Sequence, residues 1–309
     1  MRRSRLRGRR LSVALALVCV CARAQSDAPH ERASREGSEH SPVAFELQAR
    51  FGVVQAPFFT PEFAEVQAHG FVVSLAAEAW LSPAWQLGMR APLALMSIQQ
   101  PAGSYLDEAA WGNPSLFVLR RSHWHAGLAE PLSAWLGVEL ALPLAESGPS
   151  GSLIQNQALE AANALTAYRS PQAFSPGAWS LVPRAGAAFE RGPLGLRLEL
   201  EIPLLVRVAD AALPDSAKTH SLGLWPGSEV EARLRWMDSV QFSLAANATL
   251  ALLRVVDPVT SVSPLQLSLR PKLQFRLGRR LELDLAFLVP LAGPLGGSTY
   301  AAELGLRSR

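Results

Sequence analysis

Apolar and polar residues alternate along this chain from about residue 43 to its end. Between residues 265 and 277, leucine or phenylalanine fills every second position except Pro271, and glutamine, serine, arginine or lysine fills the positions between. Successive side chains of a β-strand point to opposite faces, so the pattern predicts strands with one apolar and one polar face. Pro271 lacks an N–H donor and predicts a β-bulge in this strand.

Twelve strands of this kind are predicted, most of them near the length of roughly 9–11 residues that crosses a bilayer when tilted. Their predicted ranges are 43–54, 70–81, 85–95, 113–121, 133–144, 178–190, 194–206, 228–237, 240–251, 264–277, 281–291 and 299–309. If Leu277 faces Leu281 across the turn that joins two of these strands, Arg276 faces Glu282 and Gln274 faces Asp284.

The connections between these strands alternate in length. Tight connections are predicted at 82–84, 191–193, 238–239 and 278–280, and long ones at 55–69, 96–112, 145–177, 207–227 and 252–263. Short periplasmic turns and long outer loops are typical of outer-membrane barrels. We therefore predict an all-β fold, an antiparallel transmembrane up-and-down β-barrel of about 12 strands. A soluble β-sandwich, whose strands are usually about 5–6 residues long, is the alternative.

The first residues of the chain have the features of an export signal. Residues 1–10 carry six arginines and no acidic residue, residues 11–22 are largely apolar, and residues 22–24 form a small-x-small cleavage site. We predict a signal peptide over 1–24, a flexible periplasmic lead-in over 25–42 and the barrel domain over 43–309. The expected location is the bacterial outer membrane.

Removal of residues 1–24 changes the charge and the chemistry of the chain. The full sequence has a net charge of +3, but seven arginines lie in this segment, which leaves 22 basic against 26 acidic residues. The remaining chain is acidic, and nothing in it indicates a nucleic-acid partner. Both cysteines also lie in the removed segment, so the sequence predicts no disulfide and no thiolate chemistry in the barrel.

Two short motifs open predicted strands: Trp-Gly-Asn-Pro-Ser-Leu at 111–116 and Pro-Arg-x-Gly at 183–186. In two further strands, Leu-Gly is followed shortly by Pro-Leu. In these segments the chain resembles a group of bacterial outer-membrane proteins associated with meta-pathway phenol degradation. The resemblance implies a small barrel that admits hydrophobic or aromatic compounds.

The polar face of the predicted strands gives a set of candidate lumen-lining residues, because the apolar face must meet lipid. These are Glu46, Arg50, Glu78, Arg90, Glu139, Arg184, Arg197, Glu199, Glu201, Glu229, Glu231, Arg233, Arg235, Arg270, Lys272, Arg276, Glu282 and Asp284, together with Glu190, Glu303 and Arg307. The two signs nearly balance, so the set gives no basis for predicting whether a permeant ion is a cation or an anion. Two interpretations remain open: ion pairs that stiffen a narrow barrel, or a polar path between an acidic and a basic wall.

The long connection 145–177 contains a predicted helix. Residues 156–169 are rich in helix formers, with Ala158, Ala161, Leu165 and Tyr168 at helical spacing. Such a helix either constricts the mouth of the barrel or caps its rim.

The sequence offers little catalytic chemistry. It contains no GxSxG, HExxH or P-loop motif, and His123 and His125 form a metal-ligand pair without a third ligand nearby. No catalytic residue, metal or cofactor is expected. We predict a channel for passive or facilitated passage of a small solute, with outer-membrane lipid and the outer-membrane assembly machinery as partners. A plugged structural or adhesion barrel is the main alternative, and an outer-membrane hydrolase is a further one.

Overall fold

The computed structural model describes residues 43–56, 66–99, 103–124, 132–145, 153–208, 218–254, 256–257, 264–278, 281–295 and 299–308. The predicted signal peptide and lead-in, residues 1–42, lie outside the described residues. Residues 44–309 form one compact unit, which contains the barrel.

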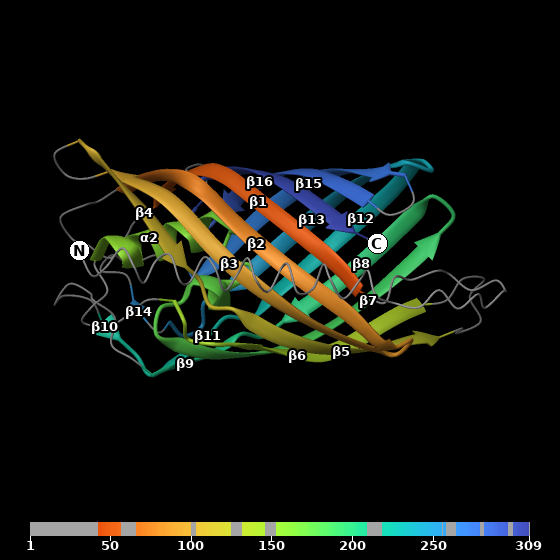
Figure 1. The fold of residues 1–309 in the computed structure, drawn as a ribbon, viewed down its shortest axis with the longest axis horizontal. Helices are drawn as coiled ribbons and strands as arrows, with labels where there is room; N and C mark the ends of the chain where they lie inside the picture. Colours follow the sequence, from red (N-terminus) through yellow and green to blue (C-terminus); the bar gives the residue numbers. More distant parts are fainter. Residues whose placement is uncertain are drawn as a thin grey trace, which may run out of the picture. The chain divides into compact units, whose positions relative to one another are not determined.

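This unit is a closed antiparallel β-barrel with twelve strands in its wall (Figure 1). Nine wall strands are single elements: β1 (Val43–Ala56), β2 (Val66–Ser82), β3 (Trp85–Gln99), β6 (Leu132–Ala141), β7 (Ala178–Arg191), β13 (Val240–Leu250), β15 (Leu265–Leu277), β16 (Leu281–Ala292) and β17 (Tyr300–Ser308). Three are interrupted once: β4 (Tyr105–Trp111) with β5 (Ser115–Trp124), β8 (Leu194–Glu201) with β9 (Leu204–Arg207), and β11 (Leu222–Leu224) with β12 (Gly227–Met237). The predicted fold class is therefore confirmed.

The first and last strands close the barrel. β1 pairs with β17 in antiparallel register from Glu46 opposite Arg307 to Val53 opposite Tyr300. The register predicted for the β15–β16 hairpin is also confirmed, because Arg276 lies opposite Glu282. A tight turn fixes the register of its flanking strands, which explains why this pairing could be read from the sequence.

Two local predictions were wrong. The expected long connection 96–112 is short, because β3 extends to Gln99 and β4 starts at Tyr105, and the two strands pair directly. The Asp107 carboxylate accepts a hydrogen bond from the Ser97 hydroxyl across the two strands, which accommodates this acidic residue in the sheet. The register also runs unchanged through Pro271, and the irregularity between β15 and β16 lies at Leu267 and Ser268.

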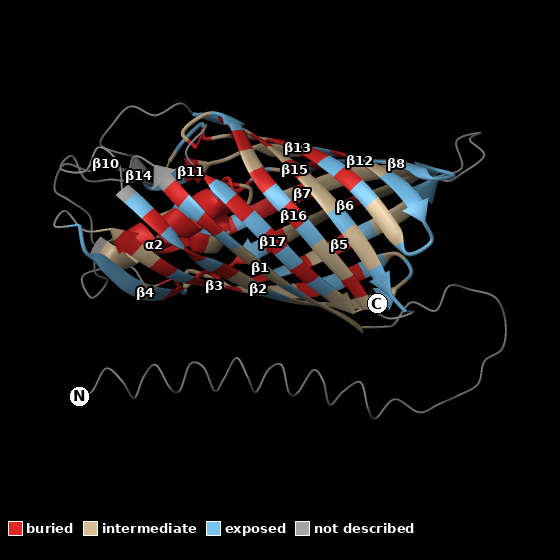
Figure 2. Ribbon diagram, turned by 90° about the horizontal axis from the view of Figure 1, so that it is seen from above, coloured by how far each residue is buried: buried red, intermediate tan, exposed pale blue. Residues whose placement is uncertain are grey.

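The two faces of the wall differ as the alternation predicts. Large apolar side chains such as Phe242 and Leu244 on β13 are exposed on the outside, while Ser243 and Asn247 on the same strand are buried inside. Figure 2 shows this alternation of exposed and enclosed positions along the strands. An apolar outer surface is suited to lipid contact.

One end of the barrel encloses a helix. The connection from β6 to β7 contains α2 (Leu153–Leu165) and the 3₁₀ helix η1 (Pro171–Phe174). Two later connections, β9 to β11 and β13 to β15, carry the short strands β10 (Lys218–Thr219) and β14 (Val256–Asp257), which pair with each other. Figure 2 shows the buried α2 at the long-loop end of the barrel. Ala158, Leu159 and Leu165 belong to one apolar cluster with inward-facing wall residues such as Val54 and Ile98. A helix in this connection is confirmed, but it covers Leu153–Leu165 rather than 156–169, and Tyr168 lies beyond its end. The helix lies inside the barrel rather than on its rim.

Candidate functional site: the lumen

A polar cavity of about 710 Å³ lies inside the barrel. All the candidate lumen residues of the sequence analysis line it: Glu46, Arg50, Glu78, Arg90, Glu139, Arg184, Glu190, Arg197, Glu199, Glu201, Glu229, Glu231, Arg233, Arg235, Arg270, Lys272, Arg276, Glu282, Asp284, Glu303 and Arg307. Arg121 and Arg169, which the sequence analysis did not select, line it too. The cavity walls therefore carry twelve basic and eleven acidic side chains, a near balance of charge.

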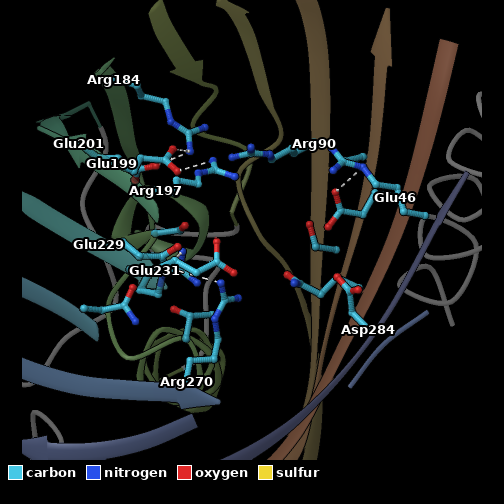
Figure 3. A pocket seen from close by; sticks show the side chains of 18 of the residues that line it. Glu46, Arg90, Arg184, Arg197, Glu199, Glu201, Glu229, Glu231, Arg270 and Asp284 are labelled. Carbon is cyan, nitrogen blue, oxygen red and sulfur yellow. Dashed lines mark hydrogen bonds and ion pairs between the residues drawn. The ribbon is translucent and has the colours of Figure 1, made fainter. Parts of the chain in front are cut away.

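One buried arginine, Arg184 on β7, binds carboxylates on the two neighbouring strands β6 and β8. The Arg184 guanidinium donates to Glu139 at 2.8 Å and to Glu199 at 2.9 Å, and it also pairs with Glu201. Glu139 accepts further hydrogen bonds from Arg90 at 3.1 Å and from the Ser115 hydroxyl at 2.7 Å. Figure 3 shows Arg184, Arg197, Glu199 and Glu201 on one side of the cavity. This cluster spans several neighbouring strands and ties them together on the lumen side.

A second cluster lies around Arg270 on β15. Its guanidinium nitrogens lie 3.6 Å from Glu229 and 3.4 Å from Glu303, and Glu303 also pairs with Arg50 at 2.8 Å. Nearby, Lys272 lies 3.5 Å from Glu231. These pairs also join different strands across the lumen wall.

The ion pairs decide between the two interpretations of the charged lumen. A basic strand faces an acidic one at β15 and β16, but β8 carries both Arg197 and Glu199, and they pair with each other at 2.6 Å. The two signs are thus interleaved over most of the described wall. In buried ion pairs of this kind, the attraction between the two charges roughly offsets the cost of removing them from water. Removal of one partner leaves the other charge buried without a counter-charge. The described lumen wall therefore carries a network of ion pairs around a cavity.

Two aromatic rings lie flat against the lumen wall, and glycines make this possible. A Cβ at Gly186 would lie 2.1 Å from Cζ2 of Trp135, and a Cβ at Gly88 would lie 2.2 Å from the Phe117 ring. Each ring therefore covers a glycine of the next strand, the arrangement that rescues glycine in a sheet. The carbon of the Arg197 guanidinium lies 4.9 Å from the centre of the Trp135 ring.

Residues 166–174 close the cavity on the side of α2. Thr166, Arg169 and Phe174 from this segment line the cavity, and Arg169 forms an ion pair with Glu229 on β12. The segment thus has one surface toward the apolar cluster around α2 and another toward the charged cavity.

Asn113 attaches this closing segment to the wall. Its side-chain amide donates to the carbonyls of Gln172 at 3.0 Å and Ser175 at 2.7 Å, and its side-chain oxygen accepts from the Ala145 backbone at 2.7 Å. A Cβ at Gly112 would lie 2.3 Å from the Ala173 carbonyl oxygen, so only glycine permits this approach. The Trp-Gly-Asn-Pro motif at 111–114 is therefore the point where the wall holds the closing segment.

A tight bend follows α2. Ala167 and Tyr168 both have left-handed backbone angles, with φ of 52° and 55°, which non-glycine residues rarely adopt. The bend lets the Tyr168 hydroxyl donate to Glu160 at 2.7 Å and sets its ring beside Trp225. Desolvation raises the pKa of the Glu160 carboxyl, and it also raises the pKa of the Tyr168 hydroxyl.

Two lumen residues were missed for identifiable reasons. Arg121 follows Arg120 directly, and both residues are polar. The alternation of apolar and polar residues therefore does not show which of the two faces the lumen. Counting by twos from Ser115, which lines the cavity, would have placed Arg121 inside. Arg169 lies in a connection, where alternation gives no information.

Other chemistry is not evident in the described part of the chain. No group of three or more potential metal ligands occurs there, and no helix there is long and apolar enough to span a membrane. Nδ1 of His123 lies 2.9 Å from the hydroxyl oxygen of Ser133. His125, the other member of the candidate metal-ligand pair, lies outside the described residues.

Comparisons with known proteins show a similarity of fold. No protein-family model matches the sequence, and no curated protein matches it. The structure is similar to the COG4313 outer membrane channel from Pseudomonas putida, with a TM-score of 0.61 and 10% identity, covering 89% of this chain and 99% of that one. Lower TM-scores of 0.48 relate it to the NanC porin, at 7% identity over 85% of this chain and 99% of that one, and to the transport unit of the autotransporter AIDA-I from Escherichia coli, at 10% identity over 93% and 97%.

Proposed function

We propose that this chain is a channel of the bacterial outer membrane through which a small solute passes, and that the segment from α2 to η1 is its gate. The observation that carries the proposal is the combination of a closed barrel, an apolar outer face and a polar cavity closed at one end by residues 166–174. A barrel satisfies its backbone hydrogen bonds internally, so it needs only its lumen chemistry to select solutes.

The proposal includes the route by which the chain reaches its place. Export by a cleaved signal peptide, insertion by the outer-membrane assembly machinery and contact with outer-membrane lipid are parts of it. The family resemblance suggests a hydrophobic or aromatic solute, whereas the twelve basic and eleven acidic side chains around the cavity favour a polar one.

The closing segment has properties that favour a gate over a permanent plug. It contains a bend of two residues with left-handed backbone angles, and its ion pair from Arg169 to Glu229 is a contact that can be broken and remade. Asn163 Oδ1 and Gln172 Oε1 are buried in this region without a hydrogen-bond partner in the described structure. Unsatisfied polar atoms weaken the docked state, which makes release easier.

Conductance in planar lipid bilayers tests the proposal. The wild-type protein should form a reproducible channel of low conductance, and deletion of residues 155–168 should increase the conductance. The substitution Arg169→Gln should raise the frequency of openings, because it removes the ion pair to Glu229. Arg235→Gln is the matched control, since Arg235 also lines the cavity but pairs with Glu190, at 3.7 Å, rather than with the closing segment.

The alternative is a structural or adhesion barrel that carries no solute. The observation that favours it is the complete burial of Leu159 and Leu165 inside the wall, which resembles the packing of a fixed core. In that case neither the wild type nor the deletion variant gives a reproducible channel, although both fold and migrate on a gel as heat-modifiable barrels. An increase in conductance on deletion rules it out.

A further inference from the structure

Arg121 on β5 is a lumen cation with an unusual environment. Its Nε and Nη2 donate to a single neutral acceptor, Oε1 of Gln86, at 3.2 and 2.9 Å. Among the described residues it takes part in no ion pair, although most of the other arginines that line the cavity have a carboxylate partner within 4.0 Å. A guanidinium has five N–H groups, so the Nη1 end of Arg121 remains available for another acceptor.

The nearest carboxylates are already bound to other groups. Glu78 accepts from Gln86 at 2.7 Å and from Arg307 at 3.1 Å, and Glu199 is shared by Arg184 and Arg197. The amide of Gln86 therefore links Arg121 to Glu78 without bringing the two charges into contact. Arg121 keeps a positive charge that no hydrogen-bonded acid neutralises.

Aromatic rings hold Arg121 in place and bring a second cation near it. The carbon of its guanidinium lies 4.9 Å from the centre of the Trp80 ring and 6.0 Å from that of Trp135. Arg197 stacks on the same Trp135 ring at 4.9 Å, so one indole carries two guanidinium groups. Cation–π contacts orient each guanidinium, but they do not remove its charge.

This cluster is open to the cavity near the tight-turn end of the barrel. Gln86, Arg121, Trp135 and Arg197 all line the cavity, and the backbone of Arg121 donates to Ala84 in the first tight turn at 2.7 Å. A solute that enters the lumen therefore reaches an oriented, unpaired guanidinium with a second one on the neighbouring wall.

We propose that Arg121, assisted by Arg197, binds the carboxylate of a small organic acid in the lumen. The indole rings of Trp80 and Trp135 already carry guanidinium groups on their faces. A ligand therefore binds here through a planar anionic group and not by stacking a ring on these indoles. A carboxylate matches the N–H edge of a guanidinium in geometry and charge. The claim that small organic acids are the solutes of the channel rests on the proposed function. The claim that Arg121 binds a carboxylate does not.

Binding is tested by equilibrium titration of the folded barrel in detergent. Sodium acetate is the probe, acetamide is its neutral counterpart, and sodium chloride keeps the ionic strength constant. Tryptophan fluorescence reports occupancy, because Trp80 and Trp135 contact the guanidinium that binds. We expect a saturable change with acetate and none with acetamide.

Three variants locate the site. Arg121→Gln should weaken acetate binding about tenfold or more, since hydrogen bonds to charged groups contribute roughly 1.5–3 kcal/mol. Arg121→Lys retains the charge without the planar edge and should bind with intermediate affinity. Arg120→Gln is the matched control: Arg120 is the adjacent residue of the same strand, it is exposed, and its guanidinium carbon lies 5.9 Å from the ring of Trp85. This variant should bind acetate as the wild type does.

The outcomes separate this inference from the proposed function. Heat-modifiable migration first establishes that each variant folds. Equal responses to acetate and acetamide, or equal acetate affinity of the wild type and Arg121→Gln, overturn the inference even when the bilayer shows a channel. Saturable binding that depends on Arg121 upholds the site even when no conductance is found, and in that case the proposed channel fails alone.

Discussion

Substitution of Asn113 by alanine should release the closing segment from the wall. The side chain is 1% exposed and makes three hydrogen bonds, two to the carbonyls of Gln172 and Ser175 and one to the amide of Ala145. A hydrogen bond contributes about 1 kcal/mol net, so loss of the two bonds to Gln172 and Ser175 weakens docking by about 2 kcal/mol. Each 1.4 kcal/mol is a factor of ten, so the released population should rise roughly thirtyfold.

Single-channel recording and hydrogen exchange measure this release. Opening events should become more frequent, and the amides of α2 should exchange faster, while the amides of β13 and β15 stay protected. Asn247→Ala is the matched control, because Asn247 is also buried in the lumen but neither of its side-chain polar atoms has a hydrogen-bond partner in the described structure. If Asn113→Ala changes opening and exchange no more than Asn247→Ala does, Asn113 does not hold the gate and our reasoning is wrong.

Three further predictions concern the Trp135 ring over Gly186, the contact between Glu160 and Tyr168, and the outer face. Gly186→Ala places a Cβ 2.1 Å from Trp135, so the ring must move; we expect about 1–3 kcal/mol of destabilisation and altered tryptophan fluorescence, and unchanged values contradict the packing. The raised pKa of Glu160 means that the docked segment binds more protons than the released one; docking should weaken as pH rises above 4.5, and Glu160→Gln should remove this dependence of channel opening on pH. Leu244→Arg puts a charge on the outer face and should cost about 2–4 kcal/mol in vesicle refolding, whereas a neutral effect argues against lipid contact there.

The wall was predictable because its information is local. Alternation with a period of two identifies the face of each residue, and a tight turn fixes the partner strand, as the opposition of Arg276 and Glu282 illustrates. β4 was missed because Asp107 and Glu108 resemble loop residues, and only their partners on β3 give them a place in the sheet.

The interior was only partly predictable, because it depends on contacts between distant segments. A helix was expected in the connection after β6, but a stripe of alanines does not say which surface it packs against. Its place inside the barrel depends on Asn113, which lies 59 residues from its partner Gln172 in the sequence. Arg169 was missed for the same reason, since it lies in a connection and its role comes from Glu229 on β12. Arg121 was missed because the adjacent Arg120 interrupts the alternation on β5.

The rings that lie flat over glycines have a consequence for the width of the pore. Phe117 and Trp135 are 2% and 9% exposed, so each adds the thickness of a ring to the wall rather than its length. Shortening them would therefore widen the passage only slightly and would uncover the glycine backbone beneath. The guanidinium groups of Arg90, Arg121 and Arg197 lie over these rings on the cavity side. Next to these rings the cavity is therefore bordered by cations, and a substitution that removes one of them to widen the cavity also removes a positive charge from its wall.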